Sequence, residues 1–287
     1  MIPALLCLLV STSAASTPAP PPDVESIEPV VHTYKHTPQG TLELHVFHPP
    51  ANGAEERRPA VLVIHGGGWH TGEAAWTFGS SQRYARLGLV AASVEYRLSD
   101  EKHVTPIDAV ADVRDAMRWL RSHADELGVD PKRIAAAGVS AGAHLAAVAA
   151  LAPDDSLPSA APDALILSSF PANVASDTWF RRIVGAHDPA AYSPLQLVHA
   201  GAPPAIVVMG EKDTVTPSAH AERFCAAMTE HGARCELLTY ASLGHLLTRN
   251  LEPRAQEEGP FDTDPEAAKD ARARVDRFLA SLGYLPH

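Results

Sequence analysis

Short apolar runs recur through the middle of the chain, and each is bounded by glycine, proline or polar residues. The run Pro59–Ile64 is continuous rather than alternating, which predicts a strand that is buried on both faces of a sheet. Four further runs predict buried strands, and a later segment predicts one more strand: Leu89–Val94, Ile134–Ala137, Ala164–Leu167, Ala205–Met209 and, last, Glu236–Tyr240.

Segments with helical periodicity separate these strands. After the second strand, apolar residues recur every three or four positions and form one helical face, and Gly128 and Pro131 then signal a helix end. Ser218–His231 and Ala267–Leu282 predict two more helices. Strands that alternate with helices of this length predict βαβ units, and therefore an α/β fold with a mostly parallel sheet. The apolar face of the first helix consists of Ile107, Val110, Val113, Met117 and Leu120.

The chain before these segments has a different composition. Residues 1–15 form a short apolar stretch followed by small residues, which predicts a cleaved signal peptide and a secreted or periplasmic protein. The alternative interpretation is a leader that is retained as a membrane anchor, because the stretch lacks the Lys or Arg that usually begins a signal peptide. Residues 16–29 are rich in proline and predict an extended linker.

An antiparallel hairpin is predicted next, because Val30–Lys35 and Thr41–Phe47 flank the glycine turn Pro38-Gln39-Gly40. From there the sequence shows neither an internal repeat nor a second domain. We therefore expect one α/β domain over residues 30–287, in which residues 171–203 form a small cap at most.

Composition and charge argue against two classes of function. The chain has 287 residues, of which 46% are hydrophobic and 20% charged, as in ordinary globular proteins. Its net charge is −11 and it has no run of Lys or Arg. Binding to nucleic acid or to an anionic membrane surface is therefore not expected.

Cysteine usage bears on the compartment. Once the predicted signal peptide is removed, Cys225 and Cys235 are the two cysteines that remain. An even number of cysteines in an exported protein favours a disulfide, although two buried thiols are the alternative interpretation.

A serine lies where a predicted strand meets a predicted helix. Gly138-Val139-Ser140-Ala141-Gly142 follows the apolar run at Ile134 and precedes the helix-forming stretch Ala143–Ala147. This is the context of a nucleophile elbow, in which a strained turn exposes the serine hydroxyl and the helix start offers unpaired N–H groups to an oxyanion. The pattern alone is weak, because glycine and serine are common residues.

A glycine-rich segment, His65-Gly66-Gly67-Gly68-Trp69, directly follows the buried strand that ends at Ile64. Three glycines allow backbone N–H groups to point into a cavity, which an oxyanion hole requires, whereas a plain turn is the structural alternative. A phosphate-binding loop is excluded, because the segment lacks the Gly-Lys-Ser/Thr ending and the dinucleotide spacing.

A serine nucleophile needs a histidine base that is held by a carboxylate. In such folds these residues follow in the order Ser, Asp or Glu, His, and Asp213 and His245 each follow a predicted strand in that order. Glu211 competes with Asp213 for the acid, but Asp213 is better spaced from its strand. We expect His144 to be packed inside the elbow helix, and His65 to shape the glycine loop rather than to act as a base.

Together these motifs resemble the esterase/lipase branch of the α/β-hydrolases, which includes bacterial acetyl esterases and feruloyl esterases. The segments after the glycine loop and around the acid and base also resemble that family. Members similar to hormone-sensitive lipase usually carry Asp where this chain has Val139 and have a longer N-terminal cap. This difference favours the smaller, open-site esterases of polysaccharide side chains. The matching segments are Tyr96-Arg97-Leu98-Ser99, Asp112-x-x-x-Ala116-x-x-Trp119-Leu120, Gly210-x-x-Asp213-x-x-x-Pro217 and Gly244-His245.

The resemblance implies an eight-stranded, mostly parallel sheet with helices on both faces and a minimal cap. It also implies a triad of Ser140, Asp213 and His245 with an oxyanion hole formed by the N–H groups of Gly67, Gly68 and Ala141. A small or polysaccharide-linked ester would be cleaved through an acyl-enzyme, with no metal and no organic cofactor. No zinc-binding His-Glu-x-x-His or paired-cysteine motif is found in the sequence.

Three other functions fit parts of this pattern. An arylformamidase-like enzyme would carry a similar glycine loop, and a prolyl-oligopeptidase-like peptidase would share the catalytic fold but needs a propeller that is missing here. A non-catalytic, ligand-binding hydrolase scaffold would have lost the histidine, whereas His245 is present. The natural ester and the oligomeric state are not determined by the sequence.

Overall fold

A computed structural model gives the structure of the protein and describes residues 26–50, 57–100, 102–154, 156–157 and 159–286. The predicted signal peptide, residues 1–15, lies outside the described residues, as do residues 16–25 of the predicted linker. Within the described residues, no helix is both long enough and apolar enough to cross a membrane.

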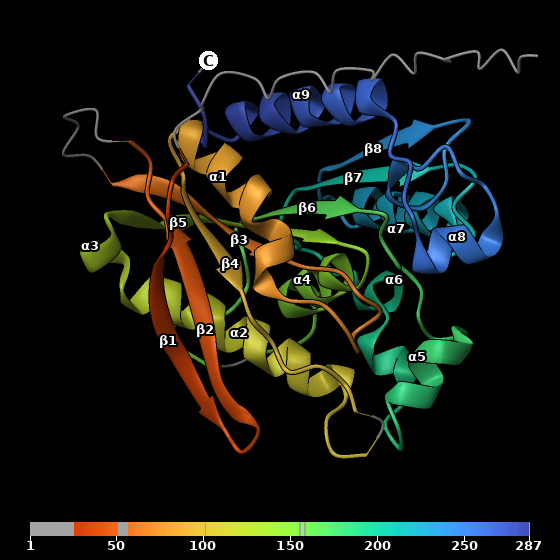
Figure 1. Cartoon of the computed structure of the whole chain (residues 1–287), viewed down its shortest axis with the longest axis horizontal. Coiled ribbons are helices and arrows are strands. Elements are labelled where there is room, and N and C mark those ends of the chain that lie inside the picture. Colours follow the sequence, from red (N-terminus) through yellow and green to blue (C-terminus); the bar gives the residue numbers. More distant parts are fainter. Residues whose placement is uncertain (1–25, 51–56, 101, 155, 158, 287) are drawn as a thin grey trace, which may run out of the picture.

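One eight-stranded sheet forms the centre of the molecule, with strand order β1-β2-β4-β3-β5-β6-β7-β8 (Figure 1). β1 pairs with β2 and β2 with β4 in antiparallel fashion, and every other neighbouring pair is parallel. The predicted mostly parallel sheet is confirmed. The strands are β1 (Val30–Thr37), β2 (Gly40–Phe47), β3 (Arg58–Ile64), β4 (Val90–Val94), β5 (Val129–Val139), β6 (Ala164–Ser168), β7 (Ala205–Gly210) and β8 (Cys235–Tyr240).

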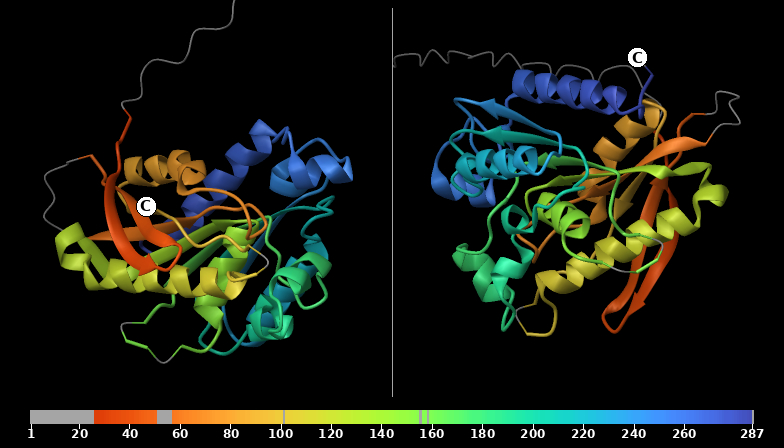
Figure 2. Two further views of the ribbon diagram at one scale, coloured as in Figure 1. Left: turned by 60° about the horizontal axis from the view of Figure 1, so that its bottom comes forward. Right: turned by 180° about the vertical axis from the view of Figure 1, so that it is seen from behind.

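Helices cover both faces of this sheet. α1 and α9 lie on one face, and α2, α4 and α7 lie on the other (Figures 1 and 2). The buried apolar residues accordingly form two clusters, one around Leu62 and Leu145 and the other around Val63 and Phe278. The helices and 3₁₀ turns are η1 (Ala74–Thr77), α1 (Phe78–Arg86), α2 (Pro106–Ser122), α3 (Ala124–Leu127), α4 (Ala141–Leu151), α5 (Thr178–Ile183), η2 (Pro189–Tyr192), α6 (Pro194–Leu197), α7 (Ser218–Glu230), η3 (His245–Leu247), α8 (Pro253–Glu258) and α9 (Pro265–Ser281).

Two of the predicted boundaries differ from the structure by five or six residues. The helix with the apolar face that includes Val113 ends at Ser122 rather than at Gly128, and the one-turn α3 follows it. Gly128, with a φ of +65°, ends α3 instead. β5 begins at Val129, earlier than predicted, because Val129 pairs with Arg58 across an irregularity in the ladder.

The chain between β6 and β7 contributes three short elements, α5, η2 and α6. Asp177 caps α5 by accepting a hydrogen bond from the backbone N–H of Phe180. Phe180 is fully buried in the same core cluster as the α4 residue Leu145. Residues 171–203 are therefore packed against the body of the protein, and this agrees with the prediction of a small cap at most.

A disulfide joins Cys225 in α7 to Cys235 at the start of β8, with the two Cα atoms 5.2 Å apart. This separation lies within the range of about 4.4–6.8 Å that disulfides require. The bond closes a loop between residues separated by 10 positions. Such a loop restricts the unfolded chain by about 2–3 kcal/mol in the chain-entropy model, and here it fixes the strand that leads to His245.

We predict that residues 16–287, recovered from the export compartment and denatured without reductant, contain no titratable thiol. Reduction before the assay should then release two thiols per chain, which serves as the internal control. Two free thiols without reduction would reject the disulfide in the exported protein and would weaken the case for export.

Candidate active site

Ser140 is the last residue before α4 and directly follows β5. Its backbone has φ 52° and ψ −122°, a left-handed conformation that costs a non-glycine residue about 1–3 kcal/mol. Gly142 allows the turn to be this sharp, because a Cβ atom there would come within 2.2 Å of the carbonyl oxygen of Ile64. The strained turn predicted from the sequence is thus present, and it holds the serine hydroxyl at the carboxyl edge of the sheet.

His245 reaches this serine from the loop after β8. Its Nε2 atom lies 3.1 Å from the Oγ atom of Ser140, and its Nδ1 atom lies 2.8 Å from the Oδ2 atom of Asp213. The imidazole is buried, with 4% of its residue surface exposed. Because β5, β7 and β8 run parallel, their carboxyl ends meet at one edge, and the structure brings all three predicted residues together there.

The Asp213 carboxylate is fixed by its own loop. Its Oδ1 atom accepts hydrogen bonds from the backbone N–H groups of Val215 (2.9 Å) and Thr216 (2.7 Å). Its Oδ2 atom accepts a further bond from the Thr216 hydroxyl at 2.7 Å. The competing Glu211 is exposed and accepts a bond from the Thr239 hydroxyl instead. Asp213, rather than Glu211, therefore faces the imidazole.

The glycine loop after β3 lies against the nucleophile. A Cβ atom on Gly66 would be 3.3 Å from the Cβ atom of Ser140, so this backbone touches the serine. Gly67 has a φ of +110°, which favours glycine and turns the following peptide units. Between described residues, no hydrogen bond is donated by the N–H groups of Gly67, Gly68 or Ala141. Within the described residues these three N–H groups therefore have no protein acceptor.

His65 is buried and contacts the backbone of this loop. Its ring is stacked on Tyr96, with centroids 4.2 Å apart, and its Nδ1 atom lies 2.7 Å from the carbonyl oxygen of Gly66. The Tyr96 hydroxyl donates to the carbonyl oxygen of His65 at 3.0 Å. Burial lowers the pKa of His65 to about 4, so the ring is neutral at pH 7. This environment agrees with a role in shaping the loop.

His144 is fully buried in α4 and connects the nucleophile helix to two other segments. Its Nδ1 atom accepts a hydrogen bond from the indole N–H of Trp69 at 3.2 Å, and its Nε2 atom lies 2.8 Å from the carbonyl oxygen of Tyr192. Burial lowers the pKa of His144 to about 4. A neutral ring with the proton on Nε2 satisfies both contacts, so His144 holds the glycine loop and residues 171–203 against α4.

Four residues that the sequence analysis did not select also bond to the site. Trp179 donates its indole N–H to the carbonyl oxygen of Gly68 at 3.1 Å, and the Ser169 hydroxyl accepts from the N–H of Leu246 at 2.8 Å. Thr216 and Gln256 contact the loops of the acid and the base. Only Thr216 had a local signal, since the side chain of an aspartate in a turn often accepts hydrogen bonds from the residues that follow it.

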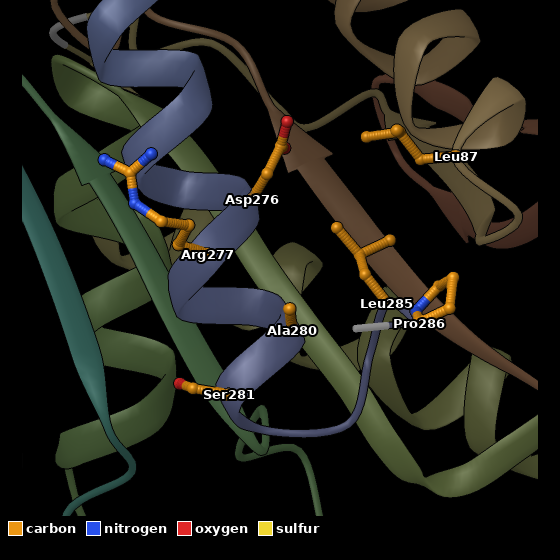
Figure 3. Close-up of a pocket in the computed structure, with 7 residues that line it drawn as sticks. All are labelled: Leu87, Asp276, Arg277, Ala280, Ser281, Leu285 and Pro286. Atoms are coloured by element: carbon orange, nitrogen blue, oxygen red, sulfur yellow. The ribbon is translucent and has the colours of Figure 1, made fainter.

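Two other features lie apart from this constellation. Glu43, His45 and Glu95 place one ligand atom each within 4.8 Å of one another, but these partly exposed groups share no bond with the three site residues. A hollow of about 630 Å³ lies between the end of α1 and α9 (Figure 3). Its carboxylate, on Asp276, pairs with Arg83, and its lining contains no histidine. Neither feature contributes a residue to the hydrogen-bonded set of Ser140, His245 and Asp213.

Two family models match consecutive parts of the chain. BD-FAE matches residues 44–170, and the dienelactone hydrolase family matches residues 169–283. Together they include Ser140, Asp213 and His245. Both agree with the resemblance that the sequence motifs indicate.

Solved structures match over nearly the whole chain. Esterase 2 of Thermogutta terrifontis phosphoramylated by tabun is 32% identical, covers 92% of this chain and 98% of its own, and has a TM-score of 0.79. The same thermophilic esterase with butyrate bound is 31% identical, covers 91% of this chain and 97% of its own, and has a TM-score of 0.78.

Curated relatives are matched over a smaller part of their length. Esterase LipQ of Mycobacterium tuberculosis is 30% identical over 225 residues, which is 70% of this chain and 52% of LipQ. The chain spans between about a third and just over half of the first curated relatives that it matches.

The geometry of the acid predicts how two substitutions differ. We expect Asp213→Asn to lower kcat for an ester by about 10⁴, because the amide would hold the wrong tautomer of His245. Glu211→Gln is the matched control and should leave kcat within about twofold, since Glu211 is exposed and faces away from the imidazole. Steady-state kinetics on p-nitrophenyl acetate would measure both. A larger loss for Glu211→Gln would show that the acid is assigned wrongly.

Proposed function

The chain belongs to the esterase branch of the α/β-hydrolase superfamily, and from this premise we propose that it hydrolyses carboxylic esters through an acyl-enzyme on Ser140. One observation carries the proposal. Asp213, His245 and Ser140 form an unbroken hydrogen-bonded chain beside three N–H groups that have no partner among the described residues.

In the proposed first step, the Oγ atom of Ser140 attacks the ester carbonyl while Nε2 of His245 accepts the hydroxyl proton. Asp213 holds the proton of the imidazole on Nδ1 and stabilises the imidazolium that forms. The oxyanion accepts hydrogen bonds from Gly67, Gly68 and Ala141, each of which contributes about 3 kcal/mol by analogy with the loss of a single donor. His245 then returns its proton to the leaving alcohol, and the ester bond breaks.

In the second step, His245 removes a proton from water, which attacks the acyl group on Ser140. The same N–H groups stabilise the second oxyanion, and Ser140 is released when the imidazolium returns the proton. A covalent reaction of a related protein supports this course. Esterase 2 of Thermogutta terrifontis is phosphoramylated by tabun, a reagent class that reacts with activated nucleophiles.

We further propose that the acyl group is short, from acetyl to butyryl, or belongs to a polysaccharide side chain. The segment between β6 and β7 supports this, because its longest helix, α5, has 6 residues and provides little material for an apolar lid. A related esterase that binds butyrate supports it as well.

We also propose that the protein is exported. The leader pattern of residues 1–15 predicts this, and the disulfide between Cys225 and Cys235 supports it, because disulfides persist in oxidising compartments.

The acyl preference can be tested with a graded series of p-nitrophenyl esters. We expect kcat/KM for the acetyl or butyryl ester to exceed that for the dodecanoyl ester by about tenfold or more, because the short helices between β6 and β7 provide no apolar lid over the added methylenes. Acetylated xylan, a feruloyl ester and N-formylkynurenine, measured in parallel, separate polysaccharide esterase from formamidase activity. A higher kcat/KM on the dodecanoyl than on the acetyl ester would contradict the proposal.

A further inference from the structure

We propose that Gln256 is a positioning residue, which holds the loops of Asp213 and His245 at the separation that their hydrogen bond requires. The inference rests on the proposed triad and extends it to a residue of α8. Gln256 makes no bond to the reacting serine. It acts through the backbone of the two loops that carry the acid and the base.

The side chain of Gln256 is fully buried and bonds to three segments. Its Oε1 atom accepts a hydrogen bond from the backbone N–H of His245 at 3.0 Å and another from the backbone N–H of Thr214 at 3.2 Å. Its Nε2 atom donates to the carbonyl oxygen of Leu251 at 3.1 Å. One oxygen therefore joins the loop after β7 to the loop after β8, next to each catalytic side chain.

The orientation of this amide is fixed by its partners. Two backbone N–H groups converge on it from one side, and only the amide oxygen can accept from both. The amino group must then face the carbonyl oxygen of Leu251. All three partners are backbone groups, so these bonds fix the course of the main chain and do not depend on the side chains of the partner residues.

The loop of His245 needs such support because its backbone is strained. Leu246 and Leu247 both have a φ of +56°, a left-handed conformation that leucine rarely adopts. Strain of this kind persists only where surrounding bonds hold the chain in place. The Ser169 hydroxyl provides one such bond, to the N–H of Leu246, and Gln256 provides the neighbouring one, to the N–H of His245.

Gly244 shows how closely Gln256 approaches this loop. A Cβ atom at residue 244 would come within 2.4 Å of the Oε1 atom of Gln256. Glycine before the histidine is therefore the residue that leaves space for the amide. The absence of a side chain at Gly244 is therefore what allows Gln256 to bond the backbone N–H of His245.

Gln256→Met tests the inference, because methionine keeps the length of the side chain but cannot accept these bonds. We expect kcat for p-nitrophenyl acetate to fall by about 30- to 100-fold with KM within about threefold, since small displacements of catalytic groups have effects of this size. Gln256→Glu, which restores an acceptor oxygen but places its second oxygen against the carbonyl oxygen of Leu251, should recover only part of the loss. Ser81→Ala is the matched control: Ser81 is equally buried and hydrogen-bonded, to Ser93, and should leave kcat within about twofold.

A double-mutant cycle separates positioning from a general loss of stability. In the Asp213→Asn background, Gln256→Met should lower kcat by less than about threefold, because the pair that Gln256 aligns is already impaired. An equal factor in both backgrounds would overturn the inference. If Gln256→Met does not fold, Gly244→Ala is the substitute variant, because its Cβ atom displaces the same amide. A double-mutant cycle of Gly244→Ala with Asp213→Asn is then interpreted in the same way.

Hydrogen exchange keeps the inference distinct from the proposed function. Gln256→Met should increase deuterium uptake in peptides that cover residues 211–216 and 243–248, and leave a peptide around Ser81 unchanged. Unchanged uptake in both loops would reject the role of Gln256 whatever the activity is. If uptake increases in Gln256→Met but the wild-type protein cleaves no ester, the positioning role is supported and the proposed function is rejected.

Discussion

The hydrogen bond between His245 and Asp213 constrains the rest of the site, because a serine at the edge of a sheet is nucleophilic only when a base is held beside it. The bond is 2.8 Å long and joins residues 32 positions apart in sequence, each on the loop after a different strand. Parallel pairing of β7 with β8 brings those loops to the same edge. Asp213 and His245 therefore meet because of the strand order of the sheet, and no single local segment could bring them together.

Several residues at this edge of the sheet have a strained backbone, so other interactions must stabilise the site. Five described residues other than glycine have positive φ values, and three of them, Ser140, Ser169 and Leu246, lie within the hydrogen-bonded surroundings of the imidazole. Each such residue costs about 1–3 kcal/mol, so the fold must offset this cost elsewhere. Two fully packed sheet faces and the bonds from Gln256 and His144 provide that support.

Much of this arrangement follows from sequence pattern, because buried strands are continuous apolar runs and the catalytic candidates come directly after them. The order of Ser140, Asp213 and His245 could therefore be predicted. α1 was missed because its sequence, from Phe78 to Arg86, is mostly polar and buries only three residues. Gln256 was missed for another reason: it lies on a helix of 6 residues, and the loops that it joins lie 11 and 42 positions away. A contact of that kind exists only in the folded chain.

The central claim is that Ser140 is the nucleophile of an ester hydrolase, and Ser140→Ala tests it most directly. The measurement is kcat for p-nitrophenyl acetate, together with the mass of each protein after treatment with a fluorophosphonate. We predict that kcat falls by about 10⁶, that the thermal unfolding midpoint stays near the wild-type value, and that only wild-type protein gains the adduct. A folded Ser140→Ala variant that retains a tenth of the wild-type rate, or that still gains the adduct, would contradict it.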